Sequence, residues 1–148
     1  MKKKLKILAA ALAAVALTAF AGCSARSAVS AEDFEKQAKS AGYTVTAASG
    51  DSSGASKTLT AAKSGKPEQI IFHVFANGIS AQNWYSAEKT ELGGTAKTVV
   101  DSDNYNKCTL ENGDIYYVLV RMDNTAVLCR VSPSNKSAAD SFLKAIKY

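Results

Sequence analysis

Hydrophobic and polar positions change their spacing several times along the chain, and each change marks an expected structural element. Three stretches carry apolar residues at the spacing of an amphipathic helix. They begin at Ser30, at Ser80, and at Ser134 or Asn135. Glycines follow the first two stretches, as is typical of helix ends. The last helix is expected to turn Ala139, Phe142, Leu143 and Ile146 inward.

Seven other stretches alternate or are rich in β-branched and aromatic residues, which predicts strands. They cover residues 43–47, 58–62, 69–76, 97–102, 105–111, 115–122 and 125–132. Asn112-Gly113 and Asp123-Asn124 are expected as two-residue hairpin turns. The chain therefore reads α-βββ-α-ββββ-α. This order predicts an α+β fold, with one or more antiparallel sheets and the helices on one face.

A weak internal match raises the possibility of tandem α-βββ units. The segment from Ser30 to Phe34 resembles the segment from Ser80 to Trp84, fifty positions later. Helix starts also look alike because the same capping chemistry recurs, so both explanations stay open. Between the first two strands, residues 49–57 are rich in Ser and Gly and lack apolar periodicity, which predicts a mobile loop.

The first 22 residues have the pattern of a secretory signal peptide. Four lysines lie within residues 2–6, the run from Ile7 to Phe20 is apolar apart from Thr18, and small residues follow. Sixteen residues from Ile7 to Gly22 would span about 24 Å as a helix, which is short for a hydrocarbon core of about 30 Å. We therefore expect removal of this segment in place of a permanent membrane span.

The end of this segment, Phe20-Ala21-Gly22-Cys23, resembles the lipobox of bacterial lipoproteins. In that family a large apolar residue, usually Leu, is followed by two small residues and an obligatory cysteine; here Phe20 takes the Leu position. The resemblance implies transfer of a diacylglyceryl group to the Cys23 sulfur and cleavage before Cys23. The alternative is an A-x-A site at Ala19-Phe20-Ala21, which would release a soluble protein beginning at Gly22.

These observations predict three parts of the chain. Residues 1–22 are the signal peptide, residues 23–29 a lipid-anchored tether, and residues 30–148 a single α+β domain. The expected location is the extracytoplasmic side of the cell membrane, and the expected membrane contact is the lipid on Cys23. A tether this short would hold the domain close to the membrane surface.

Charge argues against a nucleic-acid partner. The whole chain carries a formal charge of +5 from 18 basic and 13 acidic residues. Lys2, Lys3, Lys4 and Lys6 leave with the signal peptide, so the mature chain keeps 14 − 13 = +1. The basic character therefore describes the leader and not the domain.

With Cys23 assigned to the lipid, Cys108 and Cys129 remain as a pair. In a simple meander of the last three strands, the expected hairpin turns place Cys108 opposite Tyr117 and Cys129 opposite Val118. Neighbouring strand residues point to opposite sides, so the two sulfurs would face away from each other. We therefore expect free thiols, with Cys129 on the apolar face beside Val118, Val120, Val127 and Val131.

Candidate chemistry is sparse. His73 is the only histidine, without an evident catalytic or metal-ligating partner, and is expected to be structural or at the surface. Asp101 and Asp103 lack the remaining positions of a calcium loop. We predict no catalytic residue, cofactor or metal, and therefore no enzyme.

Aromatic and basic residues offer two possible binding surfaces. One residue of the Trp84-Tyr85 pair is expected to face outward. Tyr117, Arg121 and Arg130 should share one face of the last hairpin and form a possible partner surface. The expected function is a membrane-anchored binding or protein-interaction module with an unknown protein or small-ligand partner. The alternatives are a secreted or surface inhibitor or assembly factor, and an enzyme with an unrecognised site.

Overall fold

A computed structural model describes residues 26–49, 51–93 and 95–148 of the chain. The helices are α2 (Ala31–Ser40), α3 (Gly78–Leu92) and α4 (Lys136–Ala145), with a short 3-10 turn η1 (Pro133–Asn135) before α4. The strands are β1 (Thr44–Ala48), β2 (Lys57–Ala62), β3 (Gln69–Val74), β4 (Lys97–Asp101), β5 (Tyr105–Asn112), β6 (Ile115–Met122) and β7 (Thr125–Val131). The α+β class and the order α-βββ-α-ββββ-α are confirmed.

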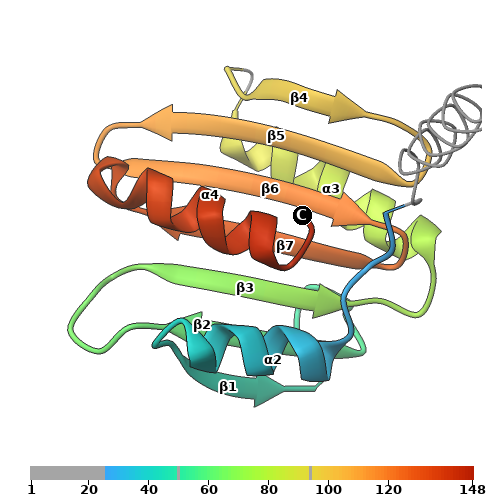
Figure 1. The fold of residues 1–148 in the computed structure, drawn as a ribbon. Coiled ribbons are helices and arrows are strands. Elements are labelled where there is room, and N and C mark those ends of the chain that lie inside the picture. Colours follow the sequence, from blue (N-terminus) through green and yellow to red (C-terminus); the bar gives the residue numbers. More distant parts are fainter. Residues whose placement is uncertain (1–25, 50, 94) are drawn as a thin grey trace, which may run out of the picture.

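All seven strands join in one antiparallel sheet, in the order β1-β2-β3-β7-β6-β5-β4. The first three strands form one meander and the last four form another. The meanders meet where β3 pairs with β7, with Ile70 opposite Cys129 and Phe72 opposite Val127. Figure 1 shows the two halves side by side in a single curved layer.

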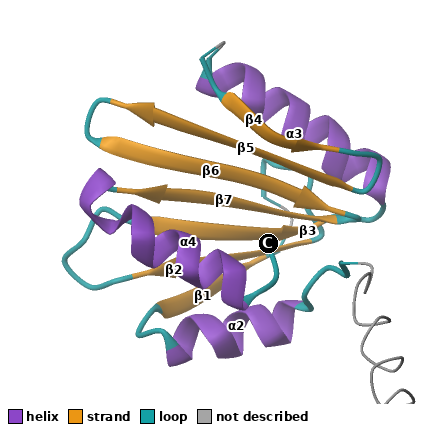
Figure 2. Ribbon diagram, turned by 45° about the horizontal axis from the view of Figure 1, so that its top comes forward, coloured by secondary structure: helices purple, strands orange, loops and turns teal. Residues whose placement is uncertain are grey.

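Helices cover both faces of this sheet. α2 and α4 lie together on one face, and α3 lies on the other (Figures 1 and 2). The expectation of helices on one face therefore holds for α2 and α4 but not for α3. The reason lies in β6 and β7, where consecutive residues are buried, so both faces of these strands need cover.

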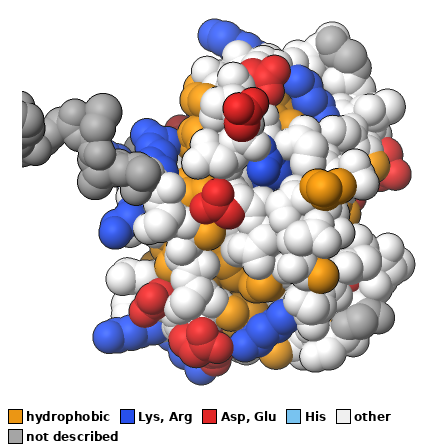
Figure 3. Space-filling model, turned by 90° about the vertical axis from the view of Figure 1, so that its right-hand side faces the viewer, with side chains coloured by type: hydrophobic (Ala, Val, Ile, Leu, Met, Phe, Trp, Pro, Cys, Tyr) orange, Lys and Arg blue, Asp and Glu red, His pale blue; other side chains and the backbone are white. Residues whose placement is uncertain are grey.

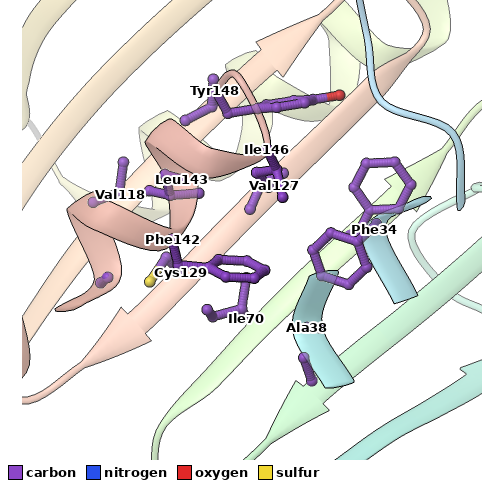
Figure 4. Packing of buried hydrophobic residues seen from close by; sticks show 14 of the residues in the cluster. Phe34, Ala38, Ile70, Val118, Val127, Cys129, Phe142, Leu143, Ile146 and Tyr148 are labelled. Atoms are coloured by element: carbon purple, nitrogen blue, oxygen red, sulfur yellow. The ribbon is translucent and has the colours of Figure 1, made fainter. Parts of the chain in front are cut away.

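The larger core lies between the sheet and the pair α2 and α4. Phe34 of α2 stacks on Phe72 of β3 with ring centroids 4.7 Å apart, and meets Phe142 of α4 edge to face. Figure 4 shows aromatic and aliphatic side chains from α2, α4 and the sheet meeting in one cluster, with the Cys129 sulfur among them. The predicted inward residues of α4 are all buried: Ala139, Phe142, Leu143 and Ile146.

The tandem-repeat hypothesis is not supported by the helix starts. Ser30 is the N-cap of α2, where its Oγ accepts a hydrogen bond from the Asp33 backbone N–H. The matching residue Ser80 lies inside α3, whose N-cap is Asn77. Asn77 Oδ1 accepts from the Ser80 backbone N–H at 2.9 Å. Asn is among the preferred N-cap residues, so the earlier start at Gly78 has a local cause.

Part of the expected tether packs on the domain. Ala28 and Val29 are half-buried against the core, and the Arg26 guanidinium lies 4.8 Å from the centre of the Tyr105 ring. Figure 3 looks at the end of the molecule beside these residues, where acidic and basic side chains are interspersed. The signal peptide, the lipobox and Cys23 lie outside the described residues.

Candidate functional site

The face of the sheet that carries α3 is only half covered by that helix. α3 packs on β6 and β7, whereas β1 is almost wholly exposed. A groove of about 810 Å³ lies between α3, the β1–β2 loop and the open part of the sheet. Its lining includes Asp51, Ser53, Thr58, Thr60, Ile71, His73, Trp84, Glu88, Glu91 and Leu128.

His73 lies in the lining of this groove. It pairs with Thr58 of β2 and points to the α3 side of the sheet, because its neighbours Phe72 and Val74 belong to the core on the other side. Only 5% of its surface is exposed. The Nδ1 atom lies 2.9 Å from Thr58 Oγ1 and 3.4 Å from Ser53 Oγ. Two hydroxyl groups therefore hold the imidazole from one side.

The β1–β2 loop fixes which ring nitrogen of His73 carries the proton. The Ser53 hydroxyl donates its hydrogen to Asp51 Oδ1, so the Ser53 oxygen can only accept from its other neighbours. The Thr58 hydroxyl also donates to Asp51, so both oxygens accept from the ring, and Nδ1 is the nitrogen that carries the proton. Neutral His73 then presents Nε2 as a hydrogen-bond acceptor.

The second ring nitrogen of His73, Nε2, has no hydrogen-bond partner among the described residues. Within residues 26–49, 51–93 and 95–148, Tyr85 Oη is the one enclosed side-chain polar atom that lacks a hydrogen-bond partner. The hydrogen bonds of the His73 ring within this part of the chain are made by Nδ1, and His73 lines the groove, so Nε2 is the ring nitrogen available to a ligand.

Two aromatic rings lie close to the His73 imidazole in the groove. The His73 ring centroid lies 4.6 Å from that of Trp84 and 5.8 Å from that of Phe75. Trp84 is half-buried and in turn lies 5.8 Å from Phe75. The expected outward member of the Trp84-Tyr85 pair is thus Trp84, and Tyr85 is buried under α3.

The charged side chains in the described lining of the groove are all acidic: Asp51, Glu88 and Glu91. Burial raises the pKa of Glu88, and the nearby Glu91 carboxylate raises it further, while Arg130 acts in the opposite direction. Burial also raises the pKa of Asp51, but hydrogen bonds from Ser53 and Thr58 outweigh it and leave this pKa below its usual value. The groove therefore has an acidic, hydrogen-bond-accepting character.

The β1–β2 loop is packed, contrary to the expectation of a mobile segment. Ala55 is buried in a cluster with Phe75, Ala81 and Ala126. The Ser56 backbone N–H donates to the Val74 carbonyl at 2.8 Å. A single small apolar residue such as Ala55 does not produce a periodic pattern in the sequence. Its burial against Phe75 and Ala81 nevertheless packs the loop beside α3.

Of the three residues expected to form a partner surface, two are accessible and one is buried. Tyr117 and Arg130 do share the α3 face, with the Arg130 guanidinium 5.7 Å from the Tyr117 ring centre. Arg121 shares their side of the sheet but is only 3% exposed. Its Nε donates to Asn106 Oδ1 at 2.7 Å, and its Nη2 donates to the Asp103 carbonyl at 2.7 Å. Arg121 is therefore a buried structural residue and offers no surface to a partner.

Sequence reasoning missed His73 because its partners are distant in sequence. Ser53 lies 20 positions away and Thr58 lies 15 positions away. Only the pairing of β2 with β3 and the path of the β1–β2 loop bring them together.

No cluster of three potential metal-ligating side chains occurs in the described part of the chain. None of the helices described is both long and apolar enough to cross a bilayer.

Comparisons of the chain with protein-family models, curated proteins and solved structures found no match.

Proposed function

We propose that this protein is a bacterial lipoprotein, anchored through Cys23 at the extracytoplasmic side of the membrane, whose domain binds a ligand in the groove beside α3. The observation that supports a binding role best is His73. A nearly buried imidazole, held by Ser53 and Thr58, keeps one nitrogen available to a ligand in a groove lined by Trp84. A small number of polar groups that converge on a concave site is typical of ligand-binding pockets.

The anchor half of this proposal is supported by the leader and by the packed start of the domain. Ala28 and Val29 contact the core, so at most four residues lie between Cys23 and the packed part of the domain. Four residues reach about 14 Å when fully extended. A lipid on Cys23 would therefore keep the domain close to the membrane surface. Two or three acyl chains would make this attachment stable.

An enzyme remains the second candidate because of the same imidazole. A neutral histidine with an available Nε2 has the form of a general base. In the part of the chain that the structure describes, however, no hydroxyl or thiol is hydrogen-bonded to Nε2. Binding without catalysis is the function that the geometry favours.

The anchor is tested by the Cys23→Ala variant expressed in a bacterium with a lipoprotein export pathway. Wild-type protein should sediment with membranes and incorporate labelled fatty acid, whereas the variant should lose the label. A wild-type protein that begins at Gly22 and appears in the medium would exclude the anchor.

The binding role is tested by placing a photocrosslinking amino acid at Thr60, in the groove, or at Lys144, exposed on α4. In intact cells the Thr60 position should capture a ligand or partner that the Lys144 position does not. Equal labelling from both positions would contradict a specific site. Capture of one secreted protein would favour the inhibitor or assembly role.

A further inference from the structure

Hydrogen-bond acceptors and negative charge meet in the groove, and no basic side chain is among its described lining. Nε2 of His73 is an acceptor because the proton lies on Nδ1. Glu88 and Glu91 are separated by three positions on α3, so they lie on the same side of the helix. Trp84 lies one turn before Glu88 on this side.

We propose that the groove binds a primary ammonium group, which donates hydrogen bonds to Nε2 of His73 and to the Glu88 and Glu91 carboxylates and lies against the Trp84 ring. This inference rests on the proposed binding function and names the chemistry of the ligand. The ammonium group could belong to a small amine or to a lysine side chain of a protein partner.

His73, Trp84 and the acidic pair Glu88 and Glu91 fit an ammonium ion better than other ligand classes. An ammonium ion has three donors and no acceptor, which matches a site that offers acceptors. The face of a tryptophan ring attracts cations. An anion would meet three carboxylates, and a neutral sugar could stack on Trp84 but would leave the acidic pair without a counter-charge.

The acidic pair itself supports a cationic ligand. Burial raises the pKa of Glu88, and the Glu91 carboxylate raises it further. Arg130 lies near enough to lower the pKa of Glu88, but it is exposed and engaged with the Tyr117 ring. A cation in the groove would relieve the repulsion between the two carboxylates. Asp51, the third carboxylate, already accepts hydrogen bonds from Ser53.

The chain provides its own probe for this site. Trp84 is the only tryptophan in the sequence, so intrinsic tryptophan fluorescence reports on the groove alone. The protein, purified as the cell delivers it and kept in a nonionic detergent, is titrated with 1,5-diaminopentane and with an N-acetylated, C-amidated Gly-Lys-Gly peptide. Choline serves as a cation that cannot donate from its nitrogen, and glucose as a neutral compound.

Amine binding should change Trp84 fluorescence with half-saturation at or below about 1 mM, and choline should bind at least tenfold more weakly. The double variant Glu88→Gln, Glu91→Gln should weaken amine binding at least tenfold. Glu35→Gln, a change on α2 at the opposite face of the sheet, should leave it unaltered. Thermal unfolding of each variant shows whether the fold is retained, and His73→Gln provides a second variant that removes the Nε2 acceptor.

The two probes distinguish the sources of the ammonium group. Binding of the peptide alone identifies a protein side chain, and binding of the diamine alone identifies a small amine. Either result supports the inference. No fluorescence change with either amine, or amine binding that survives both the double variant and His73→Gln, overturns it. Capture of a ligand at Thr60 without amine binding would overturn the ammonium inference and leave the binding function standing.

Discussion

Cys108 and Cys129 flank the same strand, β6, and face opposite sides of the sheet. Cys108 pairs with Leu119 and belongs to the cluster under α3, whereas Cys129 pairs with Val118 and belongs to the core under α2 and α4. Both are free and fully buried. The prediction of unpaired cysteines is confirmed, as is the placement of Cys129 on the apolar face.

This arrangement predicts thiols that are hidden in the folded protein. Burial raises the pKa of Cys108, and it raises the pKa of Cys129 to about 12, so neither forms the reactive thiolate near neutral pH. A thiol reagent should not label these two positions until denaturant is added, and should then label both without a reductant. Failure to label either one in the unfolded, unreduced protein would mean a disulfide and contradict the sheet order.

The register of the β5–β6 hairpin shows what local sequence leaves undetermined. Asn112-Gly113 was expected as the turn, but Asn112 pairs with Ile115, so the turn residues are Gly113 and Asp114. Gly113 has a φ of 57°, as the first position of a type II′ turn requires. The pairing of Cys108 with Tyr117 was therefore wrong by two residues. A slip of two residues preserves the face of every side chain, which is why the thiol prediction survived.

Local patterns predicted the elements well because alternation and helical spacing are local properties. Ile115–Met122 was predicted with its observed bounds, and the other strands differ by one or two residues at an end. The pairing of β3 with β7 and the placement of α3 depend on contacts between residues far apart in sequence. The groove depends on these same distant contacts. The sequence therefore identified some of its residues but could not predict that they lie close together.

Arg121 should be a determinant of stability. Its guanidinium bonds to Asn106 and to the carbonyls of Asp103 and Asp123, and so links the β4–β5 turn with the β6–β7 turn. Arg121→Ala leaves the buried Asn106 Oδ1 without this donor and removes the link between the two turns, and we expect it to lower the free energy of unfolding by about 3 kcal/mol.

Arg130→Ala is the matched control for this measurement by urea denaturation. Arg130 is exposed, and its contact with Tyr117 should contribute less than about 1 kcal/mol. Equal and small effects of the two substitutions would contradict a structural role for Arg121.

Ala55 should be sensitive to substitution even though it lies in a Ser- and Gly-rich loop. Ala55→Glu would place a charged side chain against Phe75 and Ala81, and we expect a loss of about 2–3 kcal/mol in urea denaturation. Ser52→Glu adds the same charge at an exposed position of the same loop and should change stability little. A small effect at both positions would restore the hypothesis of a mobile, unpacked loop.

His73 should make the folded protein less stable in mild acid. Burial lowers the pKa of His73 below its ordinary value of 6.5, and the Asp51 carboxylate only partly opposes this shift. Below about pH 6.5 the unfolded chain therefore binds a proton that the folded protein resists, so the free energy of unfolding falls as the pH drops through this range. Protonation of Glu88 has the opposite effect on stability, since its raised pKa favours proton uptake by the folded state.

Comparison with His73→Gln isolates the contribution of the histidine, because the chain has no other histidine. Melting temperatures measured from pH 8 to pH 5 should decline more steeply for the wild type than for the variant. Parallel profiles would show that His73 titrates normally and is not held neutral in the groove.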